Sequence, residues 1–239
     1  MPIASASLGR RISLAFLLIP PLAWLVIAYL GSLAVLLVSA FWTTNAFTGA
    51  VVHTFTSDNV KRVLTEPVFR TATARTLSVA LVVTVLCIVL AVPLAFYMAK
   101  VASPLVRLAL VVAVTTPLWA SYLVKAYAWR VLLSPEGPMS WATGYSPGYG
   151  LTATVVTLTY LWLPYMVIPV FAAFERVPDS LIDASSDLGA SDFATLRMVV
   201  APLVFPGIAA GSIFTFSLSL GDYIAVTIVG GKTQMLGNI

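Results

Sequence analysis

The chain has 239 residues, of which 60% are hydrophobic and only 9% are charged, and its mean hydropathy is +0.99. So few polar residues cannot cover the surface of a water-soluble globule, which excludes a soluble protein and indicates that lipid surrounds much of the chain. The net charge of +4 does not indicate nucleic-acid binding, because the basic residues flank apolar runs and form no basic face interleaved with aromatic residues.

Charge-free apolar runs, each near or above the length of a membrane-spanning helix, occur along the whole chain. Lipid leaves no water to satisfy backbone N–H and C=O groups, so these runs must be helical. We predict one helix in each run: 12–41, 76–99, 108–124, 152–174 and 198–221. The fold class is therefore an all-α integral membrane bundle with five spans, and residues 1–239 form a single transmembrane domain.

Several prolines lie inside the predicted helices: Pro93, Pro117, Pro164, Pro169 and Pro206. In membrane helices neighbouring groups satisfy the carbonyls that a proline leaves free. We therefore interpret these prolines as kinks and not as helix ends.

The first apolar run follows Arg10 and Arg11, a pattern that also occurs in secretory and twin-arginine signal peptides, here ending near Ala40. The run is longer than the roughly 7–15 apolar residues of a signal peptide, so we favour an uncleaved first helix. Orientation rests on the short loop 100–107, which holds Lys100 and Arg107 without an acidic residue. Basic residues in short loops favour the cytoplasmic side, so we place the N-terminus in the cytoplasm.

No catalytic, cofactor-binding or metal-binding motif is evident. Cys87 is the only cysteine and lies in the middle of the second predicted span, where packing is its expected role. His53 is the only histidine and accompanies no nucleophile motif. The segment 229–233, VGGKT, resembles the end of a phosphate-binding loop, but that motif requires glycine where Val226 stands. We expect a non-catalytic subunit without a bound cofactor.

The segment 175–202 concentrates acidic residues outside the predicted spans. It holds five of the nine carboxylates of the chain: Glu175, Asp179, Asp183, Asp187 and Asp192. Two interpretations are open, a solvated loop whose acids face water and an ordered element that docks on a basic groove of a cytosolic partner.

Local signals favour an ordered helix, a turn and a second helix. Pro178 suits the first position of a helix, and Ser180 with Asp183 forms a shortened capping box. Gly189 would supply a left-handed stop, and Ser191 could cap a second helix that merges into the fifth span.

One motif in this segment resembles a known family. Asp183-Ala184-Ser185-x-x-x-Gly189, then nine residues, then Val199-x-Ala201-Pro202, resembles the E-A-A-x-x-x-G-(x9)-I-x-L-P motif of ABC importer permeases. The spacing agrees throughout, whereas positions 183, 185, 199 and 201 carry conservative replacements. The stretches 117–129 and 217–238 look like the spermidine/putrescine branch of that family, so the resemblance covers nearly the whole chain.

The resemblance implies a type I importer permease, with a cytoplasmic coupling loop at about 175–200 that inserts into a dimer of ATPase subunits. ATP and Mg would be bound by that partner and not by this chain. The residues expected to dock on the ATPase are Asp179, Asp183, Ala184, Ser185, Asp187, Leu188, Gly189 and Pro202. In this interpretation Asp183 offers a charge-assisted bond, and Pro202 ends the amphipathic segment at the membrane entry.

Other partners and the location follow from the same resemblance. A second permease subunit, expected to be a paralogue, and an external solute-binding protein would complete the importer in the bacterial inner membrane. Members of the branch usually have a sixth span beyond the 235–238 stretch, so a sixth helix is expected to be missing after Ile239.

The substrate is the least constrained feature, and the branch's usual cargo is a polyamine such as spermidine or putrescine. Candidate pathway residues are aromatic or acidic: Trp119, Tyr122, Tyr160, Trp162 and Asp222. The favoured alternative for the aromatic residues is a place in interfacial belts or helix packing, and Asp222 could equally be a solvated helix end. The alternative function, an ATP-independent secondary transporter or channel, would need ionisable groups in mid-membrane, which the predicted spans lack.

Overall fold

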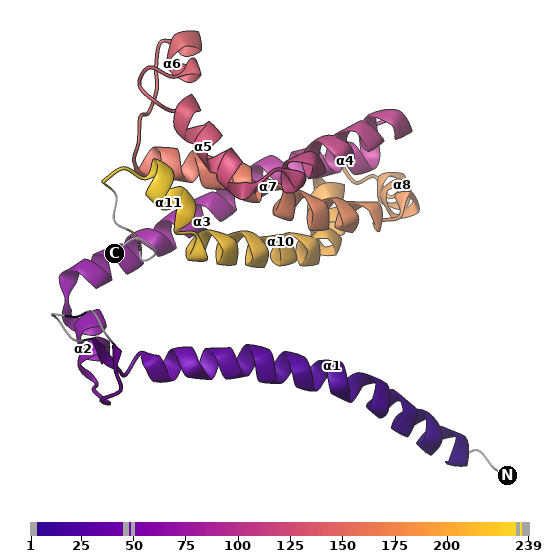
Figure 1. Ribbon diagram of the computed structural model, residues 1–239. Coiled ribbons are helices and arrows are strands. Elements are labelled where there is room, and N and C mark those ends of the chain that lie inside the picture. The colour runs from indigo at the N-terminus through magenta and orange to yellow at the C-terminus, as the bar shows by residue number, and fades with distance from the viewer. Residues whose placement is uncertain (1–3, 45–47, 49–50, 233–234, 236–239) are drawn as a thin grey trace. The chain divides into compact units, whose positions relative to one another are not determined.

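The computed structural model describes residues 4–44, 48, 51–232 and 235, with the backbone alone for 4–15. Helices make up most of it (Figure 1). The chain forms two compact units, Met1–Arg70 and Thr71–Ile239, which are described separately.

The first unit consists of a long helix, a small hairpin and a short helix. Helix α1 (Ala4–Ser39) contains Pro20 and Pro21, and none of the apolar residues in its candidate span is buried, as suits a helix surrounded by lipid. Strands β1 (Thr43–Thr44) and β2 (Val51–Val52) pair antiparallel, and α2 (Asp58–Thr65) follows. Asn59 Nδ2 donates to the carbonyls of Ala40 and Trp42 at 3.0 and 2.8 Å, which ties α2 to the end of α1.

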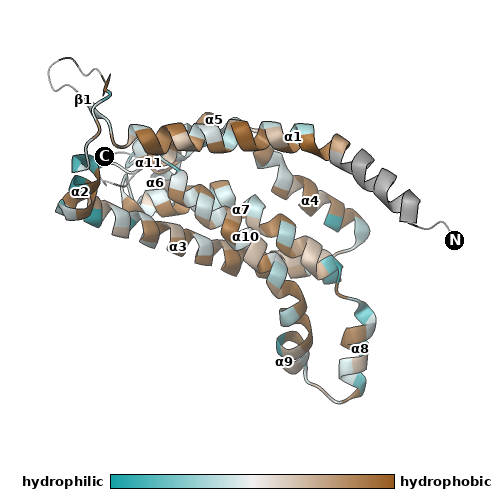
Figure 2. Cartoon of the chain, turned by 90° about the horizontal axis from the view of Figure 1, so that it is seen from below, coloured by the Kyte–Doolittle hydropathy of each residue, from teal (hydrophilic) through white to brown (hydrophobic). Residues whose placement is uncertain are grey.

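The second unit is a helical bundle. Its elements are α3 (Pro67–Phe96, shared with the first unit), the π-helical turn η1 (Tyr97–Val101), α4 (Pro104–Trp119), α5 (Tyr122–Leu132), α6 (Pro138–Thr143), α7 (Leu151–Glu175), α8 (Asp179–Asp187), α9 (Asp192–Thr195), the π-helical turn η2 (Leu196–Val200), α10 (Ala201–Gly221) and α11 (Ile224–Val229). Hydrophobic residues predominate along α3 and α10, whereas α8 carries hydrophilic ones (Figure 2).

Among the described residues, four helical stretches are long and apolar enough to cross a membrane: Phe16–Ser39, Pro67–Val101, Leu151–Glu175 and Asp192–Gly221. The pair α4 and α5 also passes this test but is bent by 98° at its break, so the spans number up to five. The all-α membrane fold is confirmed. Pro93, Pro164, Pro169 and Pro206 all lie inside helices, as predicted.

The continuous third helix predicted over 108–124 with a kink at Pro117 is wrong, because α4 ends at Trp119 and α5 begins at Tyr122. Ala120 and Ser121 between them have extended ψ angles of 143° and 134°. Such a break leaves the last carbonyls of α4 without helical partners. Lys125 Nζ donates to the Pro117 carbonyl at 2.9 Å and so satisfies one of these carbonyls. The apolar pattern could not predict the bend, because it does not show that a lysine side chain supplies this bond.

The tightest packing in the bundle joins α7 and α10. Gly207 and Gly211 lie one turn apart on α10, and a Cβ on Gly207 would lie 2.5 Å from the Ala173 Cβ and 2.7 Å from the Pro169 carbonyl oxygen of α7. This is the small-residue spacing that lets membrane helices approach closely. Cys87 of α3 packs against α7, with its Sγ 3.6 Å from the Thr159 carbonyl oxygen. The three long helices therefore share one core.

Candidate functional site

Helix α8 follows the last turn of α7 and ends in a glycine turn, as predicted. The Gly189 N–H donates to the Ser186 carbonyl at 2.9 Å and the Ala190 N–H donates to the Ser185 carbonyl at 3.1 Å. These two bonds form a Schellman motif, which requires a left-handed residue after the helix. Gly189 meets this requirement with a φ of 81°.

The capping box predicted from Ser180 and Asp183 is wrong. Pro178 is the residue that precedes the first helical residue, and no side chain caps α8. Ser180 therefore lies inside the first turn of the helix and not at the N-cap, the position from which a side chain bonds the free N–H groups. The cap predicted at Ser191 is confirmed, because its Oγ accepts from the Ala194 N–H at 3.3 Å, and α9 runs on through η2 into α10.

The residues predicted to dock on a partner are mostly exposed. Seven of the eight are exposed: Asp179, Asp183, Ala184, Asp187, Leu188, Gly189 and Pro202. Leu188 is 89% exposed although it is apolar and lies outside the candidate spans. Ser185 is partly buried and shares a hydrogen bond of 2.9 Å with Thr195 Oγ1, which joins α8 to α9. Phe193 of α9, which the sequence reasoning missed, is 71% exposed and extends this surface.

The helix runs through Pro202 to Gly221, as the predicted span 198–221 requires. Proline lacks the N–H for the usual bond to the residue four positions back, and the chain absorbs the defect in the π-helical turn η2. There the Ala201 N–H donates to the Leu196 carbonyl, five residues back.

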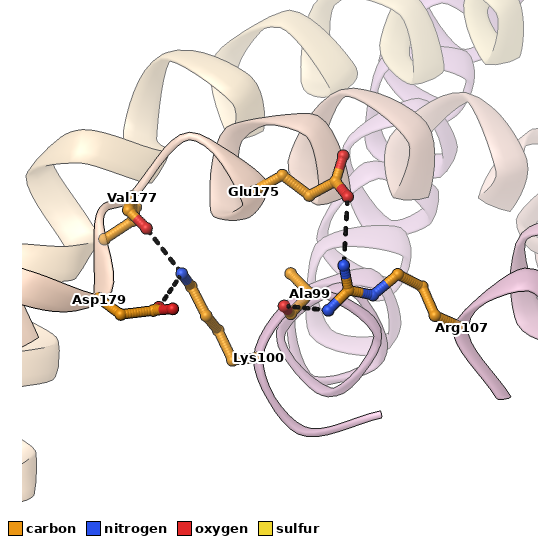
Figure 3. A network of polar contacts seen from close by, with 6 residues as sticks. All are labelled: Ala99, Lys100, Arg107, Glu175, Val177 and Asp179. Carbon is orange, nitrogen blue, oxygen red and sulfur yellow. Dashed lines mark hydrogen bonds and ion pairs between the residues drawn. The ribbon is translucent and has the colours of Figure 1, made fainter. Parts of the chain in front are cut away.

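Two basic residues, Lys100 of η1 and Arg107 at the start of α4, contact the end of α7 and the start of the α8 segment (Figure 3). Lys100 Nζ lies 2.6 Å from the Val177 carbonyl oxygen and 2.6 Å from Asp179 Oδ1. Arg107 pairs with Glu175 at 3.7 Å and donates to the Ala99 carbonyl at 3.0 Å. In the sequence these two bases indicated only the orientation of the chain. The signal that could have predicted their contacts is the opposite charge of the acidic segment 175–192.

A cavity of about 920 Å³ lies beneath α8. Apolar residues of α3, α7 and η2 form much of its wall, and charged residues of η1 and α8 stand among its lining: Pro93, Phe96, Lys100, Phe174, Asp179, Ile182 and Leu196. None of the residues of α8 is buried. The helix therefore lies on the surface of the bundle, where polar contacts hold its two ends and Ile182 packs against the core.

These contacts place the loops 100–107 and 175–192 at one end of the bundle, as the predicted topology requires. At the opposite end of the bundle, other hydrogen bonds join α5 and the start of α7 to α11. Arg130 Nη1 donates to the Ile228 carbonyl at 3.2 Å, and the Gly150 N–H donates to the Val229 carbonyl at 3.0 Å.

Asp222 lies at that opposite end and is only 9% exposed, so it is not a solvated helix end. The Tyr122 hydroxyl donates to its two carboxylate oxygens at 2.6 and 2.5 Å. The Ala225 N–H donates to its Oδ1 at 2.9 Å, which caps the start of α11. Both partners are neutral donors, so they leave the charge of the carboxylate uncompensated.

The aromatic candidates divide into three groups. The Trp162 ring stacks on Tyr122 with centroids 6.0 Å apart, so these two residues lie beside Asp222. Tyr160 pairs with Trp129 at 5.3 Å. Trp119 is 90% exposed at the end of α4, which suits an interfacial position. Within the described residues, no three His, Cys, Asp or Glu side chains are placed to hold a metal ion.

Comparisons with known proteins agree with this architecture. The model of the family "Binding-protein-dependent transport system inner membrane component" matches residues 88–239, and the chain belongs to that family. It is 42% identical over 247 aligned residues to the inner membrane ABC transporter permease protein YdcU of Escherichia coli (strain K12), covering 95% of this chain and 79% of that one. It is 30% identical to the spermidine/putrescine transport system permease protein PotB of the same organism, covering 90% and 81%.

A solved structure gives the same fold. The crystal structure of a bacterial ABC transporter involved in the import of the acidic polysaccharide alginate matches 98% of this chain and 83% of its own with a TM-score of 0.71, at 17% identity. The chain is thus a multi-pass permease subunit of an ABC transporter with the type I importer-like helical fold, a member of a bacterial inner-membrane family. The resemblance seen in the coupling-loop motif is confirmed.

Proposed function

We propose that this chain forms the translocation pathway of an ATP-driven importer, and that α8 with the Gly189 turn docks on a cytoplasmic ATPase dimer. The observation that carries the proposal is the ordered, exposed helix α8, which ends in the Gly189 turn and presents the apolar Leu188 at 89% exposure. An exposed leucine beside acidic residues has the composition of a docking surface rather than of a solvated loop. Its position outside the candidate spans fits a water-soluble partner.

In this proposal the nucleotide chemistry belongs to the partner. The ATPase subunits bind ATP and Mg, and their closure moves α8 and thereby the membrane helices. The N-terminus lies in the cytoplasm, on the same side as α8. A second permease subunit and an external solute-binding protein complete the importer.

The cargo that we propose is a small organic cation of the polyamine class. Asp222 is buried beside the rings of Tyr122 and Trp162, and the Tyr122 hydroxyl and the Ala225 N–H that bond it are neutral. A carboxylate among aromatic faces attracts ammonium groups. The PotB relative, whose name specifies spermidine and putrescine, supports the same class at 30% identity.

Reconstitution tests the proposal. The chain is co-expressed with the ATPase, permease and binding-protein subunits of its importer, and the complex is purified and placed in proteoliposomes. ATP is supplied on the side of the membrane where the ATPase lies, and the binding protein and the amine on the other side. We expect ATP-dependent uptake of radiolabelled putrescine or spermidine and none of an anionic solute such as sulfate. Uptake of the anion in preference to the amines would refute the cargo, and uptake by the chain alone without ATP would refute the importer.

A further inference from the structure

The start of α8 is fixed by one cation that bonds on both sides of Pro178. Lys100 Nζ lies 2.6 Å from both the Val177 carbonyl oxygen and the Asp179 carboxylate, and we call these two contacts the Lys100 bridge. The Lys100 side chain is only 14% exposed, whereas that of Asp179 is 80% exposed. A mostly enclosed ammonium group depends on such charge-assisted bonds, since losing them leaves a desolvated charge.

The Lys100 bridge joins the start of α8 directly to the turn after α3. A cavity lies between much of α8 and the apolar wall that Phe96 and Phe174 help to form, and no residue of α8 is fully buried. Ile182 of α8 is partly buried and packs against the core, and at the end of the helix the Ser185–Thr195 hydrogen bond joins α8 to α9. A movement of α8 therefore reaches η1 through the polar Lys100 bridge in addition to the apolar contact of Ile182.

Lys100 belongs to the π-helical turn η1, which continues α3 directly. The Ala102 N–H donates to the Tyr97 carbonyl at 2.8 Å in this turn, five residues back. Such turns interrupt the regular helical register and often occur at functional sites. Arg107, at the start of α4, adds a second contact nearby, with Glu175 at the end of α7 at 3.7 Å.

We propose that Lys100 is a positioning residue that transmits the movement of α8 to the membrane helices through the Lys100 bridge. This inference rests on the proposed function, because it assumes that an ATPase moves α8. It changes the role expected of Asp179, whose carboxylate holds Lys100 within the chain and does not serve primarily to bind the ATPase.

The test uses the purified importer complex in proteoliposomes and measures co-purified ATPase, ATP hydrolysis and putrescine uptake. Lys100→Met keeps the apolar stem and removes the charge, and Asp179→Asn removes the charge of the partner. We expect each variant to retain its ATPase and to lose about fivefold in uptake per ATP hydrolysed, since coupling between sites is typically of this size or larger. Lys100→Arg should retain most of the coupling.

The double variant Lys100→Met/Asp179→Asn distinguishes the bridge from two independent roles. Residues that act through one contact give non-additive effects, so the double variant should be no worse than the worse single variant. The matched control is Arg62→Met, which breaks the exposed Arg62–Glu66 pair of 2.9 Å in α2 and its flank and should leave coupling unchanged.

Parental coupling in Lys100→Met and Asp179→Asn would overturn the inference, and so would losses that multiply in the double variant. If Lys100→Met does not accumulate in the membrane, Asp179→Asn still decides, because it leaves Lys100 bonded to the Val177 carbonyl. Absence of the ATPase from the parent complex is a different result: it would refute the proposed function, and the inference with it.

Discussion

At the α8 end of the bundle, charged side chains meet across an open cavity, whereas at the opposite end one carboxylate is enclosed by neutral donors. In the contact between Lys100 and Asp179, the Asp179 side chain is exposed and the Lys100 side chain is mostly enclosed. Asp222 is 9% exposed and is held by the Tyr122 hydroxyl and the Ala225 N–H. Water can replace Lys100 as the partner of the exposed Asp179, but the enclosed Lys100 and the buried Asp222 each lose far more when their partners are removed. The comparison indicates that each end depends on one polar contact, which includes an exposed carboxylate at the α8 end and a buried one at the Asp222 end.

We expect the largest effect when the same substitution, glycine to valine, is made in the turn after α8 and, as a control, in the turn after α6. Gly189→Val forces a β-branched residue into the left-handed region at φ 81°, so the turn after α8 is lost. We expect the ATPase no longer to co-purify, while the amount of chain in the membrane stays at the parental level. Gly144→Val is the matched control, because Gly144 has φ 70° at the end of α6 and, like Gly189, open space around its Cβ position. Equal co-purification of Gly189→Val and the parent would remove the docking role from this turn.

The next effect concerns the α7–α10 contact that connects the ends. Gly207→Ala would place a methyl group 2.5 Å from the Ala173 Cβ and 2.7 Å from the Pro169 carbonyl oxygen, so the helices must separate. Overpacking of this kind costs about 1–3 kcal/mol, which a lowered unfolding temperature in detergent should detect. Gly221→Ala on the same helix meets nothing within 4 Å and should behave like the parent. Equal losses in both variants would show that the close approach is not what matters.

A smaller effect tests whether the enclosed carboxylate acts on cargo. Asp222→Asn keeps an oxygen that can accept from Tyr122 and Ala225 but removes the charge. Loss of one charge-assisted interaction predicts about a tenfold fall in putrescine uptake with unchanged membrane abundance. Tyr122→Phe removes a donor and leaves the charge, so its uptake should fall less. Parental uptake by Asp222→Asn would reduce Asp222 to a cap of α11.

The smallest effect concerns the joint between α8 and α9. Ser185→Ala removes the 2.9 Å hydrogen bond to Thr195 and should cost about 1 kcal/mol of stability, with a slight loss of co-purified ATPase. Ser186→Ala is the control, because the Ser186 hydroxyl bonds the Ile182 carbonyl of its own helix. A larger effect at Ser186 than at Ser185 would contradict the assigned role of this bond.

The sequence by itself determined the membrane class, four of the spans and the glycine turn, because each depends on local physics. Lipid forces a long apolar run into a helix, and a glycine after an amphipathic segment can adopt the left-handed conformation that ends it. Spacing from Asp183 to Pro202 was enough to predict the family to which the chain belongs.

Only the tertiary structure decided the bend after Trp119, the π-helical turn before Pro202 and the burial of Asp222. In each case a residue distant in the sequence or a shift of helical register satisfies a group that local reasoning left free: Lys125 at the bend, the π-helical bond of Ala201 and the Tyr122 hydroxyl 100 positions away. The contact between Lys100 and Asp179 was equally hidden, because the two residues lie 79 positions apart in the sequence. Hydropathy records how a residue partitions into lipid, whereas these contacts depend on which helices pack together.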